Sequence, residues 1–224
     1  MKEINVVKRD GTKEPFDANK INTAILKACE GLPDQISKVV QVATELQLTL
    51  FDGITTEQLD EAVIQTVLQN VKDDPDYDKI AARLLLKTVY KQILGDYETA
   101  EELKKLHARE FPKFVKAAVK EGLLDKRMTD GRFDLKKLAA ELDPARDDLS
   151  KYLGVVTNKN RYALRKQNGS PIETPQFTHM RIAMGLSYNE SDPTTAAIEF
   201  YNHMSNLEYV PGGSTRVNAG GSFP

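Results

Sequence analysis

One stretch near the start of the chain, VVKRDGTKEPF at 6–16, constrains the fold more than any other. The two valines at 6–7 are β-branched and favour a strand, and Asp10-Gly11 favours a tight turn. Phe16 marks the end of a second short strand. The stretch therefore predicts a β-hairpin at the start of the chain.

Helices are expected directly after the hairpin. Asp17 is a good N-cap, and Phe16 before it can pack on Ile21 as a hydrophobic staple. Apolar residues then continue at helical spacing. Further helix starts are expected at Ser37, at Thr55 with Gln58 in a capping box, and at Pro75 behind Asp74. A hairpin followed by four helices predicts a first domain over residues 1–95.

The chain beyond Gly95 predicts a second, mainly helical domain over 96–205 and a last segment over 206–224. Helices are expected around 103–107, 114–120 and 135–142, with a hairpin-like turn at Asn168-Gly169. Capping patterns mark further helix starts at Thr99 with Glu102, at Thr174-Pro175 and at Asp192-Pro193. LEYV at 207–210 predicts a strand, and the glycine-rich sequence after Pro211 predicts a loop.

The charge balance and the hydropathy pattern exclude several classes of protein. Thirty-one Lys and Arg against 33 Asp and Glu give a net charge of −2, without the basic excess of a nucleic-acid binder. No apolar run approaches the length of about 18 residues that a membrane helix needs. The first ten residues lack the features of a secretory signal. We expect a cytoplasmic protein that binds neither nucleic acid nor membranes.

Residue types that commonly carry catalysis are sparse. His107, His179 and His203 lie far apart without partners at metal-ligand spacing, so each is interpreted as a partly exposed structural residue. The two common phosphate-binding motifs, GxxxxGK[ST] and GxGxxG after a strand, are missing. Cys29, the only cysteine, is expected to be a small buried apolar group. No catalytic residue and no metal site is predicted.

The hairpin offers a possible anion site. Lys8 and Arg9 point to opposite faces of the strand, so one of them can lie over the helices. Lys20 lies in the first turn of the expected helix, where free backbone N–H groups favour an anion. A triphosphate carries about four negative charges, and cations from separate elements would hold it by charge-assisted hydrogen bonds. The alternative is that all three are solvated surface charges.

Three separated motifs carry a resemblance to a known family. They are VVKRDG with Phe16 and Lys20-Ile21, FDGITTEQLDEAVI at 51–64, and DYDKIAARLLLKTVYKQ at 76–92. Together they resemble the ATP-cone, a regulatory nucleotide-binding domain at the N-terminus of many ribonucleotide reductase large subunits. The resemblance implies a mainly α, α+β fold, with a four-helix bundle under a small three-stranded sheet that forms a lid.

The resemblance also implies the contacts to an ATP or dATP effector, with Mg²⁺. These would come from Val7, Lys8, Arg9, Glu14, Lys20, Ile21, Thr56 and Lys91. The sequence departs from the family pattern at Asp17, Asp60 and Lys87. These departures leave open the adenine contacts, the preference for ATP or dATP and the number of nucleotides bound.

Sequences in the rest of the chain continue the resemblance. RYALR, ETPQFTHMRIAMGLS and EYVPGGSTRVNAGG are similar to the part of the reductase large subunit that leads into the first strand of its ten-stranded α/β barrel. In the family, the loop after that strand holds the substrate phosphate. The resemblance implies that Ser214 and Thr215, with backbone N–H groups around Gly212 and Gly213, make these contacts. An ordinary flexible tail is the alternative.

The resemblance predicts the N-terminal portion of a ribonucleotide reductase large subunit that is not catalytic alone, because the redox and radical cysteines of the family are absent from these residues. We expect a subunit that is encoded in two parts or interrupted by an intervening element, and that is completed by a second polypeptide carrying the cysteines. A radical-generating small subunit and an oligomeric assembly are expected as further partners. A truncated gene product is the plainer explanation. A stand-alone ATP-cone regulator or scaffold and a degenerate cone acting as a structural cap remain alternatives. A zinc-ribbon repressor is disfavoured by the single cysteine.

Overall fold

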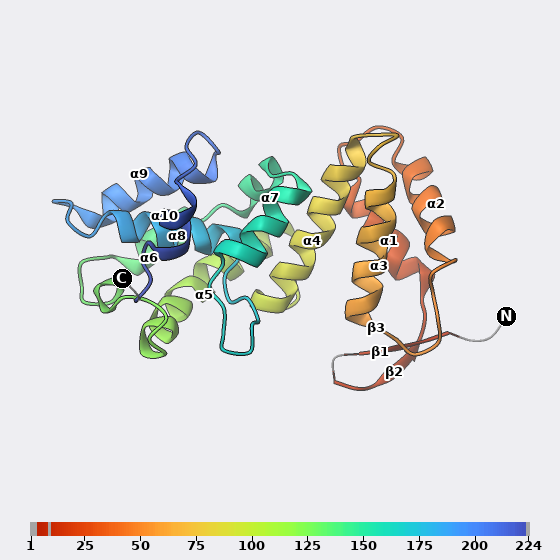
Figure 1. Ribbon diagram of the computed structural model, residues 1–224, viewed down its shortest axis with the longest axis horizontal. Helices are drawn as coiled ribbons and strands as arrows, with labels where there is room; N and C mark the ends of the chain where they lie inside the picture. The colour runs from red at the N-terminus through yellow and green to blue at the C-terminus, as the bar shows by residue number, and fades with distance from the viewer. Residues whose placement is uncertain (1–3, 9, 223–224) are drawn as a thin grey trace. The chain divides into compact units, whose positions relative to one another are not determined.

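Helices make up most of the computed structural model, which describes residues 4–8 and 10–222. Two units follow one another along the chain, Met1–Thr88 and Val89–Pro224. The three named strands lie in the first unit, near the N-terminus in Figure 1. The mainly α, α+β class predicted from the sequence is confirmed.

The sheet has the order β2-β1-β3, from β1 (Asn5–Val7), β2 (Lys13–Pro15) and β3 (Ile54–Thr55). β1 is antiparallel to β2 and parallel to β3, with Val7 opposite Thr55. Gly11 has a φ of +84°, which glycine adopts without strain, and its N–H donates to the Lys8 carbonyl at 2.9 Å. The predicted hairpin is confirmed, and the parallel strand β3 completes the sheet.

Four helices follow in the first unit: α1 (Ala18–Ala28), α2 (Gln35–Leu46), α3 (Thr56–Gln69) and α4 (Asp76–Leu94), whose last residues belong to the second unit. The Asp17 carboxylate accepts from the Asn19 N–H at 2.9 Å and caps α1. Thr55 and Gln58 form both hydrogen bonds of the capping box at α3. These two predicted helix starts are confirmed at the residues that cap them.

The start of α2 differs from the prediction. It begins at Gln35 rather than Ser37, after Asp34 in the left-handed region with a φ of +51°. The Asp34 carbonyl accepts the first helical hydrogen bond, from the Lys38 N–H at 3.1 Å. The Asp34 side chain makes no capping hydrogen bond, so a prediction based on capping side chains puts the start of α2 too late.

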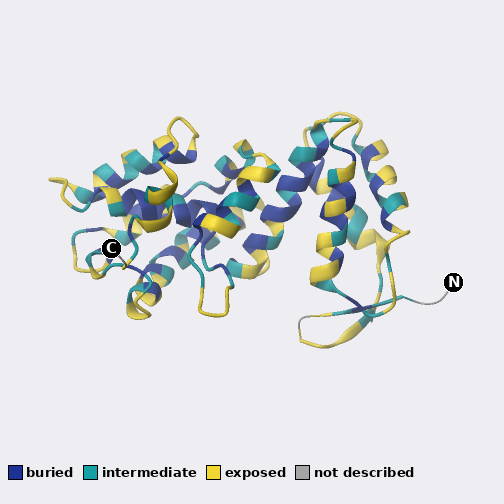
Figure 2. Ribbon diagram, viewed as in Figure 1, coloured by how far each residue is buried: buried dark blue, intermediate teal, exposed yellow. Residues whose placement is uncertain are grey.

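Buried side chains of all four helices form the interior of the first unit, and α4 is buried over most of its surface, as the burial colours of Figure 2 show. The fully or almost fully buried side chains of this interior include Ile25, Cys29, Val42, Val67 and Ile80. A smaller cluster under the sheet joins Val6, Ile54 and Leu59, and Phe16 and Ile21 both pack against it. The expected staple residues therefore share one apolar cluster, and the expected burial of Cys29 is confirmed.

The second unit contains six further α-helices among the described residues. These are α5 (Ala100–Lys120), α6 (Leu135–Glu141), α7 (Tyr152–Thr157), α8 (Pro175–Leu186), α9 (Pro193–Ser205) and α10 (Gly213–Asn218). Short 3₁₀ helices lie at Lys126–Met128 and Pro144–Leu149, and a π-helical turn at Asn158–Tyr162. The predicted caps at Thr99, Thr174 and Asp192 are confirmed, each accepting from a backbone N–H in the first turn.

The expected break between 107 and 114 is wrong, because α5 is one continuous helix that contains Pro112. Phe111 and Phe114, on either side of the proline, both contact Phe177 with ring centroids 5.2 Å apart. This packing offsets the cost of a proline in a helix, about 3 kcal/mol.

The structure also overturns two expectations for the end of the chain. Residues 207–210 form no strand, because the N–H groups of Glu208 and Tyr209 donate to the His203 carbonyl and continue the end of α9. Part of the expected glycine-rich loop is helical, as α10. The turn at Asn168-Gly169 is confirmed, closed by a 2.9 Å hydrogen bond from the Gly169 N–H to the Lys166 carbonyl.

Candidate functional site

Three charged side chains of the first unit meet beside the hairpin. Lys8 follows β1, Glu14 lies on β2 and Lys20 lies in the first turn of α1. Lys8 Nζ is 2.7 Å from Glu14 Oε2, and Lys20 Nζ is 3.4 Å from Glu14 Oε1. We refer to Lys8, Glu14 and Lys20 as the lid cluster. Two ammonium groups share one carboxylate, so the cluster keeps an excess positive charge.

Hydrogen bonding between Lys8 and Glu14 favours the charged form of both side chains. The hydrogen bond to Glu14, followed by its charge, raises the pKa of Lys8. The hydrogen bond from Lys8 is also the largest influence on Glu14 and lowers the pKa of its carboxyl group. Lys8 and Glu14 are therefore both charged at neutral pH, and a polyphosphate would compete with the Glu14 carboxylate for the Lys8 ammonium group.

The sheet brings two helix starts to the lid cluster. β2 leads directly through Asp17 into α1, so Lys20 projects from the first turn after the strand. The pairing of Val7 with Thr55 brings Thr56, the first residue of α3, beside the end of β1. Helix N-termini carry partial positive charge, and together with the two lysines they would attract an anion.

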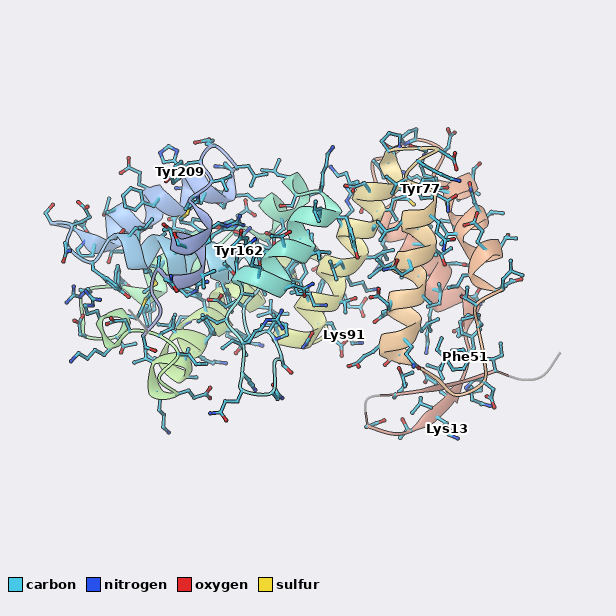
Figure 3. All side chains as sticks on the ribbon, in the orientation of Figure 1. Lys13, Phe51, Tyr77, Lys91, Tyr162 and Tyr209 are labelled. Atoms are coloured by element: carbon cyan, nitrogen blue, oxygen red, sulfur yellow. The ribbon has the colours of Figure 1, made fainter. Side chains whose placement is uncertain are left out.

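Six of the eight residues expected to contact an effector gather around this sheet: Val7, Lys8, Glu14, Lys20, Ile21 and Thr56. Arg9 lies outside the described residues. Lys91, labelled in Figure 3, belongs to the second unit, where its ammonium group is 2.8 Å from Asp96. The assignment of all eight to a nucleotide site stays a prediction.

The three positions that depart from the family pattern have different roles in the structure. Asp17 caps α1. Asp60 lies exposed on α3, and Lys87 lies exposed on α4. Their effect on a bound base stays a prediction.

Ser214 and Thr215, the expected substrate-phosphate residues, lie in α10 of the second unit. Ser214 is exposed and Thr215 is half-buried. The segment around α10 is held by Arg181 of α8, which donates to the Ala219 carbonyl at 2.7 Å and to the Arg216 carbonyl at 3.3 Å. A glycine at 185 allows this close approach, since a Cβ there would lie 2.2 Å from the Gly220 nitrogen.

Sequence reasoning missed Arg181 and its partner Glu173. Their ion pair is fully buried, with Arg181 Nε 2.8 Å from Glu173 Oε1. The signal was present, because an arginine inside the apolar run HMRIAMG is buried only when an acidic partner is near.

The histidines occupy three different environments. His107 is fully buried, which corrects the expectation of a partly exposed residue, and it bonds the Leu103 carbonyl and the Thr174 hydroxyl. Burial lowers its pKa to about 4. His179 is half-buried and His203 is exposed beside Glu208. Within 4–8 and 10–222, no three His, Cys, Asp or Glu side chains gather in a way that could hold a metal ion.

Two family models match the chain, in order. The ATP cone domain matches residues 4–92, and the ribonucleotide reductase all-alpha domain matches residues 148–224. The chain matches the N-terminal part of ribonucleotide reductase large subunits. The ATP-cone resemblance and its place ahead of reductase sequence are confirmed.

Curated relatives agree with this family. The chain is 34% identical over 217 residues to ribonucleoside-diphosphate reductase subunit alpha of Helicobacter pylori, covering 96% of this chain and 26% of the relative. It is 32% identical over 220 residues to the corresponding subunit of Chlamydia trachomatis, covering 97% of this chain and 20% of the relative. The large subunit of Arabidopsis thaliana is 29% identical over 225 residues. The chain thus spans about a fifth to a quarter of these reductase subunits. None of the helices in the described ranges is both long and apolar enough to cross a membrane.

Proposed function

We propose that this chain is the regulatory N-terminal portion of a ribonucleotide reductase large subunit, and that ATP or dATP binds at the lid cluster to control the enzyme. The single observation that carries the proposal is the convergence of Lys8 and Lys20 on one carboxylate between two helix starts. The match of residues 4–92 to the ATP cone supports the choice of an adenine nucleotide.

The phosphates would take the place that Glu14 now holds. Each ammonium group would then form a charge-assisted hydrogen bond to phosphate, and Thr56 would add its hydroxyl and backbone N–H at the start of α3. Arg9 and Lys91 would complete the set of cations that the resemblance implies. Mg²⁺ would enter bound to the triphosphate oxygens, and water molecules would complete the coordination of the ion.

Control of activity requires that the effector binds two states of the enzyme with unequal affinity. ATP and dATP differ by one hydroxyl, worth about 1 kcal/mol, or about 1–3 kcal/mol if a buried partner loses its bond. A single site would therefore act as a modest switch. An oligomer that binds several effectors would sum this difference over its sites.

The reduction of ribonucleotides itself would come from the parts of the reductase that this chain does not match. The relatives are four to five times longer, and their names assign them reduction of ribonucleoside diphosphates. The catalytic barrel, its cysteines and a radical-generating small subunit would act with this portion, with the barrel on the same or on a second polypeptide. Ser214 and Thr215 would then contribute to the substrate-phosphate contacts in α10.

Calorimetric titration of the chain with ATP, dATP and GTP tests the effector proposal. We expect adenine nucleotides to bind and GTP to give no heat. Lys8→Ala and Lys20→Ala should each weaken ATP binding about tenfold, the low end for a charge-assisted hydrogen bond.

Lys13→Ala is the matched control, because it removes the same charge from the same hairpin, outside the lid cluster. It should change ATP affinity less than about twofold. An equal loss in all three variants would mean that the hairpin attracts anions diffusely and has no defined site. No binding by any nucleotide would overturn the proposal.

A further inference from the structure

The segment between α7 and α8 is unusually basic. Residues 158–166, NKNRYALRK, contain four Lys and Arg and no acidic residue. Asn158–Tyr162 form a π-helical turn, a rare conformation that occurs often at functional sites. This turn packs against both α8 and α10.

Two guanidinium groups gather on the Tyr162 ring of this turn. Arg216 Cζ, from α10, lies 3.8 Å from the ring centroid, and Arg161 Cζ lies 5.7 Å from it. Across the described ranges neither guanidinium forms an ion pair with a carboxylate. Two like charges near one aromatic ring repel each other, and burial together with the charge of Arg161 lowers the pKa of Arg216, so an anion that contacts both would relieve the repulsion.

Arg181 shows the contrast with a purely structural arginine. Its guanidinium is fully buried, paired with Glu173, and donates to the carbonyls of Tyr162 (2.9 Å) and Arg216 (3.3 Å). One neutralised arginine thus fixes the backbone of Tyr162, which carries the ring, and of Arg216, which stacks on it. The charges of Arg161 and Arg216 are not used for this scaffold and stay available to a ligand.

Two further observations concern the polar groups and packing of this turn. Asn158 is 5% exposed, and its side-chain amide nitrogen has no hydrogen-bond partner. Such a buried donor costs about 1–3 kcal/mol unless something accepts from it. The Tyr162 hydroxyl lies 3.8 Å from the position of a Cβ on Gly213, so the ring reaches the start of α10, next to Ser214.

We propose that Arg161 and Arg216 form a phosphate-binding pair that supplies the charge for anion binding at α10. The ligand class is a diphosphate ester, whose oxygens can accept from both guanidinium groups at once. Only the identification of this ester as a ribonucleotide substrate rests on the proposed function. Ser214 and Thr215, in the same short helix, would add neutral donors beside the two charges.

The test uses the 224-residue chain with Lys8→Ala and Lys20→Ala, so that the lid cluster does not bind the probe. Pyrophosphate is titrated first and a ribonucleoside diphosphate second. The NMR signals of the backbone amides report binding in both titrations. We expect saturable shifts at residues 158–166 and 213–220. Arg161→Gln and Arg216→Gln should each weaken pyrophosphate binding about tenfold.

Arg109→Gln is the matched control, because it removes the same charge from α5 of the same unit, where Arg109 pairs with Glu110. It should change the affinity less than about twofold. Circular dichroism of each variant checks that it folds. A variant that does not fold is replaced by Arg→Lys, which keeps the charge but lacks the planar fork, and should show an intermediate loss.

The outcomes separate this proposal from the effector proposal. No saturable pyrophosphate binding, or an equal loss in the Arg109→Gln control, overturns the arginine pair whatever ATP does at the lid cluster. Pyrophosphate binding that depends on both arginines supports the pair even if ATP does not bind the original chain. Binding of pyrophosphate without the ribonucleoside diphosphate would keep the anion pair and refute its assignment to a substrate.

Discussion

Asp147 is the buried acid on which we base a quantitative prediction. It is 3% exposed in the 3₁₀ helix Pro144–Leu149, where the Tyr90 hydroxyl donates to Oδ2 and Gln176 Nε2 donates to Oδ1 at 2.6 Å. Tyr201 bonds to the same Gln176 side chain. Burial raises the pKa of Asp147 from 3.8 to about 7, against the lowering effect of the two hydrogen bonds.

The sign of the pH dependence follows from the two pKa values. Between pH 4 and 7 the unfolded chain ionises at residue 147 while the folded chain keeps its proton. The unfolded state therefore binds fewer protons, and the free energy of unfolding falls as the pH rises through this range. A pKa of about 7 against 3.8 corresponds to about 4 kcal/mol, lost at up to about 1.4 kcal/mol per pH unit.

The perturbation is Asp147→Asn, which keeps the shape of the protonated carboxyl group and cannot ionise. Urea unfolding followed by circular dichroism, from pH 4 to pH 8, gives the free energy of unfolding of both proteins. His107 and His179, whose pKa values burial lowers to about 4, give the opposite slope below pH 6.5. They are present in both proteins, so the difference between the two curves isolates Asp147.

We expect the stability of the original chain, relative to Asp147→Asn, to fall by about 3–4 kcal/mol between pH 4 and pH 8. A flat difference would mean that Asp147 has an ordinary pKa in the folded state. A relative gain with rising pH would mean that the hydrogen bonds from Tyr90 and Gln176 outweigh burial and hold the carboxylate ionised. Either result would refute the reasoning.

Two further predictions concern packing. Gly185→Ala should lower the free energy of unfolding by about 1–3 kcal/mol, because the added Cβ would meet the backbone of Gly220. Gly154→Ala in α7 is the control, because its Cβ would make only ordinary contacts and should not lower the free energy of unfolding. Urea unfolding of both variants measures the difference, and equal stability would contradict it. Cys29 is fully buried, and burial raises the pKa of its thiol, so a thiol reagent should label it at the rate of local unfolding and faster in urea.

Local rules predicted the parts of the fold that neighbouring residues determine. The turn at Asp10-Gly11, the N-cap Asp17 and the capping box of Thr55 each satisfy backbone groups within a few residues. Such bonds form whatever the rest of the chain does. The sequence therefore predicted the hairpin and most helix starts at the correct residues.

Features set by distant residues were not predicted. Lys38 is 4% exposed because Asp74, 2.8 Å away, and Asp76, 3.3 Å away, reach it from the start of α4. Nothing near Lys38 in the sequence signals this burial. The helix α5 continues through Pro112 for the same kind of reason, since its contact with Phe177 comes from another element.

The candidate site divides in the same way. Lys8 and Lys20 were predicted as cations near one helix start, because hairpin and helix are adjacent in sequence. That both would share Glu14 depends on side-chain placement across the turn, which no spacing rule gives. Arg161 and Arg216 are 55 positions apart in the sequence, and only the packing of α10 against the π-helical turn brings them to one ring.

Glu14 gives the lid cluster a property that the arginine pair lacks. Its carboxylate lies between Lys8 and Lys20, so under the proposed function a phosphate bound to both lysines would displace it. Glu14→Gln removes this competing charge and should strengthen the binding of tripolyphosphate, which has no nucleoside. If Glu14 also accepts a hydrogen bond from the nucleoside, ATP should gain less than tripolyphosphate, or lose affinity. Calorimetry with both ligands on the same variant separates the two effects, and weaker binding of tripolyphosphate would show that Glu14 positions the lysines and does not compete with the phosphate.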